Sequence, residues 1–272
     1  MPVFDPAAYA ELIAALTGLS VSAAAAIRRA RGCGSIRIKA DGSPVTAADE
    51  AAEAVIRKGL KRLAPDLPIV SEEHVDKEKP AIDNADYFLV DPLDGTKEFI
   101  AGSDEYTVNI AIVADGVPIL GVVTAPALGL IWRGIVGRGA ERLKFSSRSI
   151  STPQAIRTRS RPEEELVVMV SRSHLDANTE AYLAGLPHQL RRVPCGSSIK
   201  FCRLADGTAD LYPRLAPTRD WDVAAGHAVL AAAGGSVVDP DGTALIYGSP
   251  ALLIPAFVAW GGPAPTEGAA TD

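Results

Sequence analysis

The feature that most constrains this chain is the stretch Asp91-Pro92-Leu93-Asp94-Gly95-Thr96, which follows the apolar run Tyr87-Phe88-Leu89-Val90. A short run rich in β-formers predicts a buried strand, so both carboxylates fall where that strand reaches the surface. Pro92 disfavours a helical conformation before it, and Gly95 leaves the following backbone N–H groups open to an anion. Carboxylates, a carbonyl and a phosphate are ligands of Mg²⁺, so the stretch predicts a metal site, although Asp, Pro and Gly also form ordinary turns.

Length and charge limit the partners. With 272 residues, the chain can form one large domain or two packed halves around a sizeable core. Its net charge of −6 leaves no basic excess to neutralise a polyphosphate backbone, which argues against a nucleic acid polymer as partner. If the substrate is a small phosphate, the negative charge of the protein would repel it. Metal ions and a few local Lys or Arg side chains must then make the binding site positive.

Composition also bears on location. The uncharged run at residues 12–27 is short for a membrane span and follows acidic rather than basic residues, so we expect neither a span nor a signal peptide. The three cysteines, Cys33, Cys195 and Cys202, have no CxxC spacing and are predicted to be reduced thiols of a cytoplasmic protein. Peripheral association with the inner membrane face stays open, as does the choice between monomer and homodimer.

Residues 1–150 are expected to form an α+β half in which helices cover a largely antiparallel sheet and which carries most metal ligands. Periodicity and turn signals predict helices over residues 6–31 and 47–63, and strands over residues 36–38, 68–70, 87–90, 106–114, 117–124, 128–135 and 140–145. Asp115-Gly116 is a hairpin signal between two of these strands. Thr46 and Asp49 resemble a capping box at the start of the second helix, with Asp in place of Glu.

Residues 151–260 are expected to form a smaller α/β half with its own sheet, because strands and helices alternate there. The predicted order is a strand at 166–170, a helix at 177–186, a strand at 189–193, a helix at 197–204, a strand at 209–212, a helix at 221–233, and strands at 236–238 and 252–258. Residues 146–165 are predicted to be a connection, and residues 261–272 a disordered tail.

Acidic residues stand at three separate kinds of position: Glu72 at a strand end, Asp91 and Asp94 at a strand-to-turn junction, and Asp222 at a helix start. Each has an ordinary explanation by itself, since a strand end is solvated and a helix start favours an acid. Together they suggest that a divalent ion gathers them. Asp220, two residues before Asp222, is expected to be a surface acid.

At this point the motifs resemble a known family. The segments at residues 41–49 (DGSPVTAAD), 71–73 (SEE), 91–100 (DPLDGTKEFI) and 221–226 (WDVAAG) are similar to those of the inositol-monophosphatase-like, lithium-sensitive phosphatase superfamily. Segments 97–99, 171–174, 196–202 and 212–214 are similar to 3'(2'),5'-bisphosphate nucleotidases of the bacterial CysQ type. The resemblance covers roughly residues 30–260, and it implies a layered αβαβα sandwich of the inositol-monophosphatase (sugar phosphatase) type.

The resemblance also implies a metal centre. One Mg²⁺ would be held by Glu72, Asp91 and the main-chain carbonyl of Leu93, and a second by Asp91, Asp94 and Asp222; in related enzymes a third, weaker metal shares Glu72. Thr96, hydrogen-bonded to Asp49, would orient a metal-activated water, so the catalytic residues would be Glu72, Asp49 and Thr96. Asp49 could thus serve as helix cap and as support for Thr96, at different stages.

Substrate contacts are implied in the same way. Ser198, Lys200 and Arg214 would bind the second phosphate of a nucleotide, and His174 and Tyr212 would lie near the adenosine. The full set of implied substrate-binding residues is Glu72, Leu93, Asp94, Gly95, Thr96, His174, Ser198, Lys200, Tyr212, Arg214 and Asp222. The alternative is that Lys200 and Arg214 are merely a helix face and a solvated strand end.

The resemblance implies a Mg²⁺-dependent phosphatase that removes the 3'-phosphate of adenosine 3',5'-bisphosphate (PAP) to give AMP, and it extends this expectation to the sulfated form (PAPS). Paired metals suit this reaction because they activate water and neutralise the oxygens around phosphorus. An inositol monophosphatase or fructose-1,6-bisphosphatase of the same superfamily is the alternative. A non-catalytic nucleotide or metal sensor is a third, disfavoured because all the metal acids and Thr96 are present.

Overall fold

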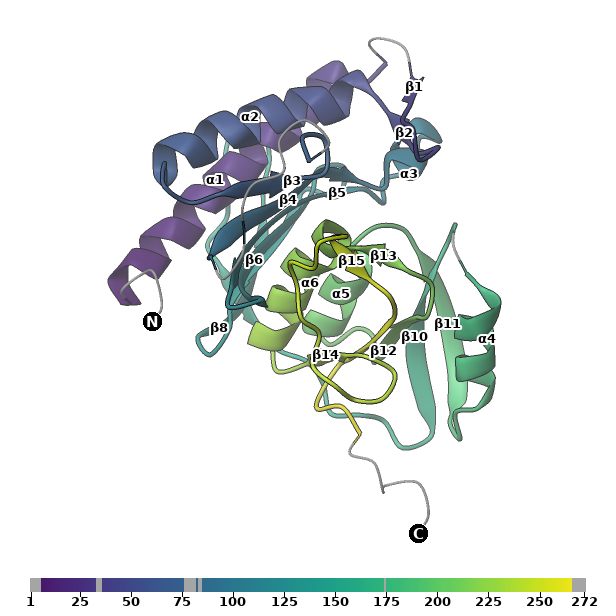
Figure 1. The fold of residues 1–272 in the computed structure, drawn as a ribbon. Helices are drawn as coiled ribbons and strands as arrows, with labels where there is room; N and C mark the ends of the chain where they lie inside the picture. Colours follow the sequence, from purple (N-terminus) through teal and green to yellow (C-terminus); the bar gives the residue numbers. More distant parts are fainter. Residues whose placement is uncertain (1–5, 33–35, 76–81, 83–84, 174, 266–272) are drawn as a thin grey trace.

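The computed structural model describes residues 6–32, 36–75, 82, 85–173 and 175–265. Five layers of helix and sheet lie on one another (Figure 1). Helices α1 (Pro6–Ala30) and α2 (Ala47–Leu63) cover one face of a seven-stranded sheet, α5 (Ile199–Ala205) and α6 (Asp220–Ala232) lie between that sheet and a five-stranded one, and α4 (Ala177–Ala184) covers the outer face. This arrangement confirms the predicted αβαβα sandwich.

The seven-stranded sheet has the order β3-β4-β5-β6-β7-β8-β9 and is antiparallel except for the β3–β4 pair. Its strands are β3 (Ile69–Ser71), β4 (Tyr87–Asp94), β5 (Thr107–Ala114), β6 (Val117–Ala125), β7 (Leu130–Ile135), β8 (Gly139–Lys144) and β9 (Gln154–Ile156). The hairpin predicted at Asp115-Gly116 is present, and both residues have positive φ, as a tight two-residue turn requires.

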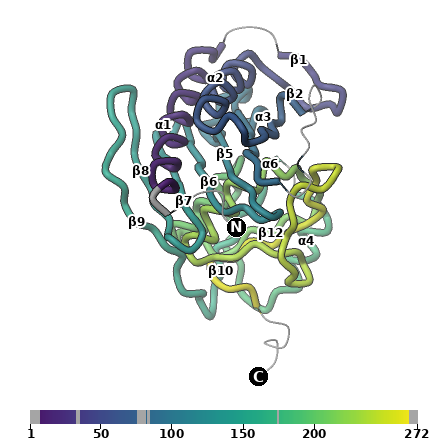
Figure 2. Tube along the Cα trace, turned by 60° about the vertical axis from the view of Figure 1, so that its left-hand side comes forward, coloured from purple at the N-terminus to yellow at the C-terminus, as the bar shows by residue number. Residues whose placement is uncertain are grey.

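One expectation for this region was wrong. Residues 146–165 were predicted to be a connection without strands, but β9 pairs with β8 and becomes the edge of the first sheet. β8 and β9 lie beyond β7 at this end of the sheet (Figure 2). Edge pairing relies on backbone hydrogen bonds, so it needs little apolar periodicity in the sequence, and the polar composition of β9 concealed it.

The five-stranded sheet has the order β11-β10-β12-β16-β14, from β10 (Glu165–Ser171), β11 (Gln189–Cys195), β12 (Leu211–Arg214), β14 (Ser236–Val238) and β16 (Phe257–Trp260). The single strand predicted at residues 252–258 is instead two strands in different sheets. β15 (Leu253–Ile254) pairs with β13 (Thr218–Arg219), and β16 pairs with β12 and β14. Pro255 separates them, and proline has no N–H to donate to a ladder.

Helix α1 is longer than the uncharged run that suggested it. Within residues 8–30, a window of 18 residues has a mean hydropathy of 1.7, so by length and composition alone this helix could cross a membrane. In the structure its apolar residues, including Leu16 and Ile27 with no exposed surface, belong to the core between the two outer helices and the first sheet. A core helix and a membrane span share the same composition, and here half of the segment is buried inside the protein.

Two further expectations lie wholly or partly outside the described residues. Cys195 and Cys202 are buried free thiols, while Cys33 lies outside the described part of the chain. Of the tail expected to be disordered, residues 261–265 form no helix or strand, and residues 266–272 are not described.

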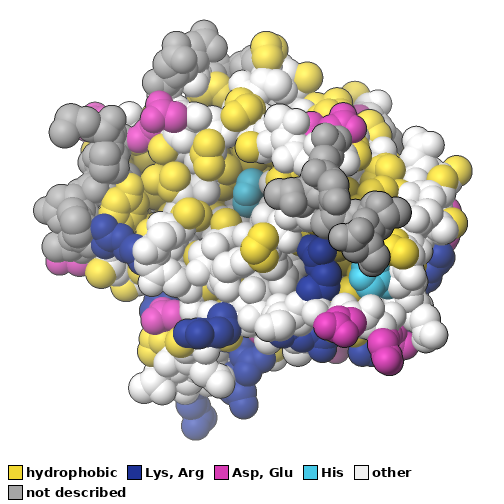
Figure 3. Space-filling model, turned by 90° about the horizontal axis from the view of Figure 1, so that it is seen from below, with side chains coloured by type: hydrophobic (Ala, Val, Ile, Leu, Met, Phe, Trp, Pro, Cys, Tyr) yellow, Lys and Arg dark blue, Asp and Glu magenta, His cyan; other side chains and the backbone are white. Residues whose placement is uncertain are grey.

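On the face seen from below, basic and acidic side chains are interspersed among apolar and other groups (Figure 3).

Candidate active site

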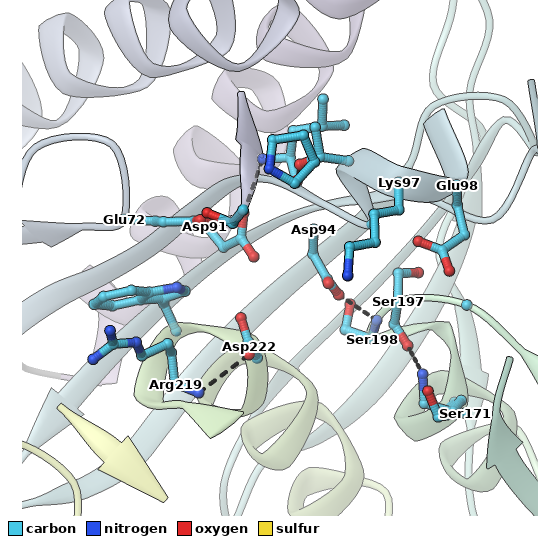
Figure 4. Close-up of a pocket in the computed structure, with 18 of the residues that line it drawn as sticks. Glu72, Asp91, Asp94, Lys97, Glu98, Ser171, Ser197, Ser198, Arg219 and Asp222 are labelled. Atoms are coloured by element: carbon cyan, nitrogen blue, oxygen red, sulfur yellow. Dashed lines mark hydrogen bonds between the residues drawn. The ribbon is translucent and has the colours of Figure 1, made fainter. Parts of the chain in front are cut away.

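Three of the predicted metal ligands converge at the edge of the first sheet. Asp91 and Asp94 lie on β4, where the pairing with β5 shifts register between them, and Asp222 lies in the first turn of α6. One carboxylate oxygen from each lies within 4.8 Å of the others. The three side chains point into a common space between the sheet and α6 (Figure 4). The register shift matters because a regular strand would place residues 91 and 94 on opposite faces.

The electrostatics of this cluster fit a divalent cation. Burial raises the pKa of Asp94 to about 6, and the charge of Asp222 adds to this effect. Burial and the charges of Glu72, Asp94 and Asp222 raise the pKa of Asp91 well above its ordinary value. Several oxygen ligands in one crowded, partly buried place repel one another unless a dication neutralises them. The donor set is therefore suited to Mg²⁺.

Glu72 is held somewhat apart from this cluster. It follows β3, and its Oε1 accepts a hydrogen bond from Lys39 Nζ at 2.7 Å, while Glu73 accepts one from the same ammonium at 2.7 Å. Burial raises the pKa of Glu72 to about 7; the charge of Lys39 opposes this and that of Asp222 adds to it. Lys39 was not predicted to belong to the site, because a single lysine before a turn does not indicate which carboxylates it contacts.

The predicted hydrogen bond between Thr96 and Asp49 is present at 3.1 Å, and the same hydroxyl lies 3.1 Å from the carbonyl oxygen of Leu93. The second oxygen of Asp49 accepts from the Thr46 N–H at 2.8 Å and from its hydroxyl at 2.6 Å, which completes the capping box of α2. Asp49 thus performs both tasks simultaneously, with one oxygen for each, rather than at different stages. The helix cap and the support of Thr96 do not compete.

A cavity of about 430 Å³ contains these carboxylates and receives residues from both sheets. Of the predicted substrate-binding residues, those that line it are Glu72, Leu93, Asp94, Gly95, Thr96, Ser198, Lys200, Tyr212, Arg214 and Asp222. His174 lies outside the described residues. Asp49 supports the site from behind, through Thr96.

Ser198 has different partners from those that the resemblance implied. Its hydroxyl is buried and lies 2.7 Å from Asn109 Oδ1 and 2.8 Å from the Thr107 hydroxyl, while its N–H donates to Asp94 Oδ2 at 2.5 Å. In this arrangement the hydroxyl contacts β5 and the N–H holds Asp94, while Ser198 also lines the cavity. A role of Ser198 in binding phosphate stays a prediction.

The cationic residues at this end of the cavity are fixed by their surroundings. Lys200 is 4% exposed, donates to Ser197 O at 2.6 Å, and places Nζ 5.0 Å from the ring centre of Tyr212. Tyr212 itself packs edge-on against Phe201. Arg214 has a buried Nε without a hydrogen-bond partner in the described part of the chain. A buried guanidinium nitrogen without a partner points to an anionic ligand.

Other residues at the site had not been predicted. Thr218 donates its hydroxyl to Asp222, and the Arg219 N–H donates to the same carboxylate at 3.2 Å. The Arg219 guanidinium lies 5.6 Å from the ring centre of Trp221, and both side chains line the cavity. Lys97 also lines it and extends toward Asp94 (Figure 4). Lys97 and Trp221 lie within the sequence motifs at residues 91–100 and 221–226. That position was the only indication in the sequence that they belong to the site.

Asp220 was expected to be a surface acid, and this was wrong. Its side chain is fully buried, and Oδ2 accepts from the Gly248 N–H at 2.8 Å. Burial raises its pKa to about 6, with a smaller contribution from the charge of Asp222. The helix periodicity placed Asp220 before an apolar run, but only the tertiary structure packs the 247–252 loop over it.

The fold and this site together define the class of protein. The family model of the inositol monophosphatase family matches residues 8–270, and the chain belongs to that family. Among solved structures, an inositol monophosphatase from Anabaena (Nostoc) sp. PCC 7120 is similar, with a TM-score of 0.71 and 26% identity over 93% of this chain and 90% of that one.

More specific similarity is to nucleotidases. The 3'(2'),5'-bisphosphate nucleotidase CysQ of Escherichia coli (strain K12) is 48% identical over 210 residues, which cover 77% of this chain and 81% of the relative. The crystal structure of CysQ from Bacteroides thetaiotaomicron gives a TM-score of 0.79 and 32% identity over 92% of this chain and 97% of that one. The resemblance drawn from the motifs is confirmed at both levels, superfamily and CysQ-type subgroup.

Proposed function

We propose that this protein is a Mg²⁺-dependent 3'(2'),5'-bisphosphate nucleotidase that hydrolyses the 3'-phosphate of PAP to give AMP, and that also accepts PAPS. The observation that carries the proposal is a cluster of three carboxylates facing Lys200 and Arg214 within one cavity. The relatives named CysQ support the choice of substrate. We further propose that the enzyme works in the cytoplasm.

We propose two Mg²⁺ ions, one held by Glu72, Asp91 and the Leu93 carbonyl, and the other by Asp91, Asp94 and Asp222, whose carboxylates lie together in the structure. When bound, Mg²⁺ lowers the pKa of water and neutralises the charge of the phosphate. We propose that Asp91 contributes to both sites, because its carboxylate is buried and the charges of both Glu72 and Asp94 act on it.

The chain's own contribution to hydrolysis is orientation and proton handling. When the Thr96 hydroxyl donates to Asp49 Oδ1, its oxygen is free to accept a hydrogen bond from the attacking water. The capping-box bonds from Thr46 fix Asp49, so the acceptor does not need to reorganise during the reaction. Gly95 and Thr96 line the cavity, and we propose that their backbone N–H groups bind oxygens of the reacting phosphate.

Specificity for a nucleotide bisphosphate is proposed to come from Lys200 and Arg214, which would bind the phosphate that is not hydrolysed. A guanidinium binds phosphate through two parallel hydrogen bonds, and burial strengthens both. Inositol 1-phosphate has only one phosphate and gains nothing from these residues, whereas fructose 1,6-bisphosphate has a second phosphate but no base. These two substrates therefore distinguish the proposal from its alternatives within the family.

The test is a phosphate-release panel with Mg²⁺ on PAP, PAPS, inositol 1-phosphate, fructose 1,6-bisphosphate and AMP. We expect kcat/KM for PAP to exceed that for inositol 1-phosphate and for fructose 1,6-bisphosphate by about a hundredfold or more. Asp94→Asn should lower kcat for PAP by at least about a hundredfold, because it removes a charged ligand. A preference for inositol 1-phosphate or fructose 1,6-bisphosphate over PAP would refute the proposed substrate. Full activity of Asp94→Asn would refute the proposed metal ligands.

Arg214→Ala isolates the specificity argument. We expect KM for PAP to rise about tenfold or more, since a charge-assisted phosphate contact is worth at least about 1.4 kcal/mol. Any residual turnover of inositol 1-phosphate should change by less than about twofold, because that substrate carries no second phosphate. An unchanged KM for PAP would remove Arg214 from the binding site while leaving the metal centre intact.

A further inference from the structure

An ion pair joins the two halves beside Gly196, a residue that lines the cavity. Glu105 lies between α3 (Thr96–Ile100) and β5, and Arg172 follows β10. Arg172 donates from Nε and Nη2 to the two carboxylate oxygens of Glu105, each at 2.9 Å. Most exposed ion pairs contribute little, but this pair is bidentate and Glu105 has a third donor, the Gly196 N–H at 2.7 Å. We call Glu105, Arg172 and Gly196 the Glu105 clamp.

The clamp holds a turn with a demanding backbone. Ser197 has a φ of +51°, a left-handed conformation that a side chain disfavours. A Cβ at Gly196 would lie 2.9 Å from the carbonyl oxygen of Glu105, so only glycine fits against this segment. Arg172 Nη2 also donates to Pro194 O at 3.0 Å, which fixes the strand that leads into the turn. A turn in this conformation needs outside contacts to keep it, and the clamp supplies them.

The peptide group between Ser197 and Ser198 contacts the candidate active site from both of its ends. The Ser198 N–H donates to Asp94 Oδ2 at 2.5 Å. The Ser197 carbonyl accepts from Lys200 Nζ at 2.6 Å. A metal ligand and the proposed phosphate-binding lysine are therefore both oriented by one turn, and that turn is held from the opposite half of the molecule by Glu105.

We propose that Glu105 is a positioning residue, which keeps Asp94 oriented for metal binding and Lys200 oriented for the second phosphate through the turn at Gly196–Ser198. This inference rests on the proposed function, because it takes Asp94 as a Mg²⁺ ligand and Lys200 as a phosphate ligand. Glu105 itself touches neither ligand. Its effect is on how precisely the two groups are placed before either ligand arrives.

Glu105→Gln tests the inference, since it preserves the shape of the side chain and removes its charge. Mg²⁺ binding is measured by calorimetry on metal-free protein without substrate, and we expect the dissociation constant to rise about five- to tenfold. KM for PAP should rise by a similar factor, whereas kcat at saturating Mg²⁺ and PAP should fall by less than about threefold. A merely structural role would lower the melting temperature without this separation of binding from kcat.

Glu180→Gln is the matched control, because it breaks another arginine–carboxylate pair of the second half, Arg192–Glu180, with contacts of 2.7 and 2.9 Å. It should leave Mg²⁺ affinity and KM unchanged. If Glu105→Gln does not fold, Arg172→Lys keeps the charge but loses the bidentate geometry, and the same rise in the Mg²⁺ dissociation constant is expected in smaller degree.

The outcomes separate the two proposals. If the unsubstituted protein binds no Mg²⁺ or releases no phosphate from PAP, the proposed function fails. If it does both, but Glu105→Gln (or Arg172→Lys in its place) matches it in Mg²⁺ affinity and in KM for PAP, then only the role of the Glu105 clamp is overturned.

Discussion

Asp49 illustrates how much a single side chain can do once both of its oxygens are placed. One oxygen completes the capping box of α2, and the other accepts from Thr96. The sequence offered these as alternative roles, because spacing specifies the local bond to Thr46 but gives no information about a residue 47 positions away. The cap fixes the carboxylate that accepts from Thr96, so a local stabilising interaction would also serve the proposed reaction.

At the residue scale, the raised pKa values of the metal acids predict competition between protons and Mg²⁺. The pKa is about 6 for Asp94 and about 7 for Glu72 in the metal-free protein. Both groups must lose their protons to bind metal, so Mg²⁺ affinity should rise from about pH 5 to about pH 8 and then level off. Calorimetry in two buffers of different ionisation enthalpy measures the protons released on binding. An affinity independent of pH over this range would contradict the prediction.

At the scale of elements, the position of α6 decides the position of Asp222. The helix packs against β6 without side chains between the backbones, because Gly121 faces it: a Cβ there would lie 2.2 Å from the carbonyl oxygen of Ala225. Thr218 and the Arg219 N–H then fix the carboxylate of Asp222 at the helix start. Close packing of strand and helix is therefore what brings Asp222 to the carboxylates of β4.

Gly121→Ala tests this packing. The added methyl group must push α6 away from β6, and we expect the free energy of unfolding to fall by about 1–3 kcal/mol in urea titrations. Mg²⁺ affinity should fall as well, because Asp222 moves with the helix. Gly18→Ala is the matched control: no atom lies within 4 Å of its added Cβ, and in the interior of α1 alanine should stabilise by about 0.5–1 kcal/mol. Equal effects of the two substitutions would contradict the packing argument.

At the scale of the whole molecule, the candidate metal site lies between layers and takes residues from each of them. Asp91 and Asp94 belong to the first sheet, while Asp222 begins a helix that lies between the two sheets. The cavity wall opposite them comes from the second sheet and α5. Metal binding should therefore stabilise the arrangement of layers, and its absence should leave mutual repulsion among buried acids.

Thermal unfolding of metal-free protein in EDTA tests this consequence. Because the folded-state pKa values of Glu72 and Asp94 lie above their ordinary values of 4.5 and 3.8, the stability that these groups contribute is present at low pH and is lost as pH rises to about 7. Mg²⁺ at a hundred times its dissociation constant should add about 2.7 kcal/mol. For a chain of this size, that raises the melting temperature by roughly 5–10 °C. Asp222→Asn should reduce the increase; an equal increase in that variant would contradict the shared site.

The sequence by itself determined most of the element order, the superfamily and the candidate metal acids, because strand and helix periodicity and short motifs are local properties. The tertiary structure decided where those groups meet. In the structure Asp220 is buried, the Ser198 hydroxyl contacts Asn109 on β5, Lys39 pairs with Glu72, and β9 forms the edge of the first sheet. The stretch from Asp91 to Thr96 predicted a metal site, but the register shift within β4 and the approach of α6 placed its carboxylates beside Asp222. Such contacts join residues distant in sequence, and the physical reason they could not be predicted is that packing between layers leaves no periodic trace in the chain.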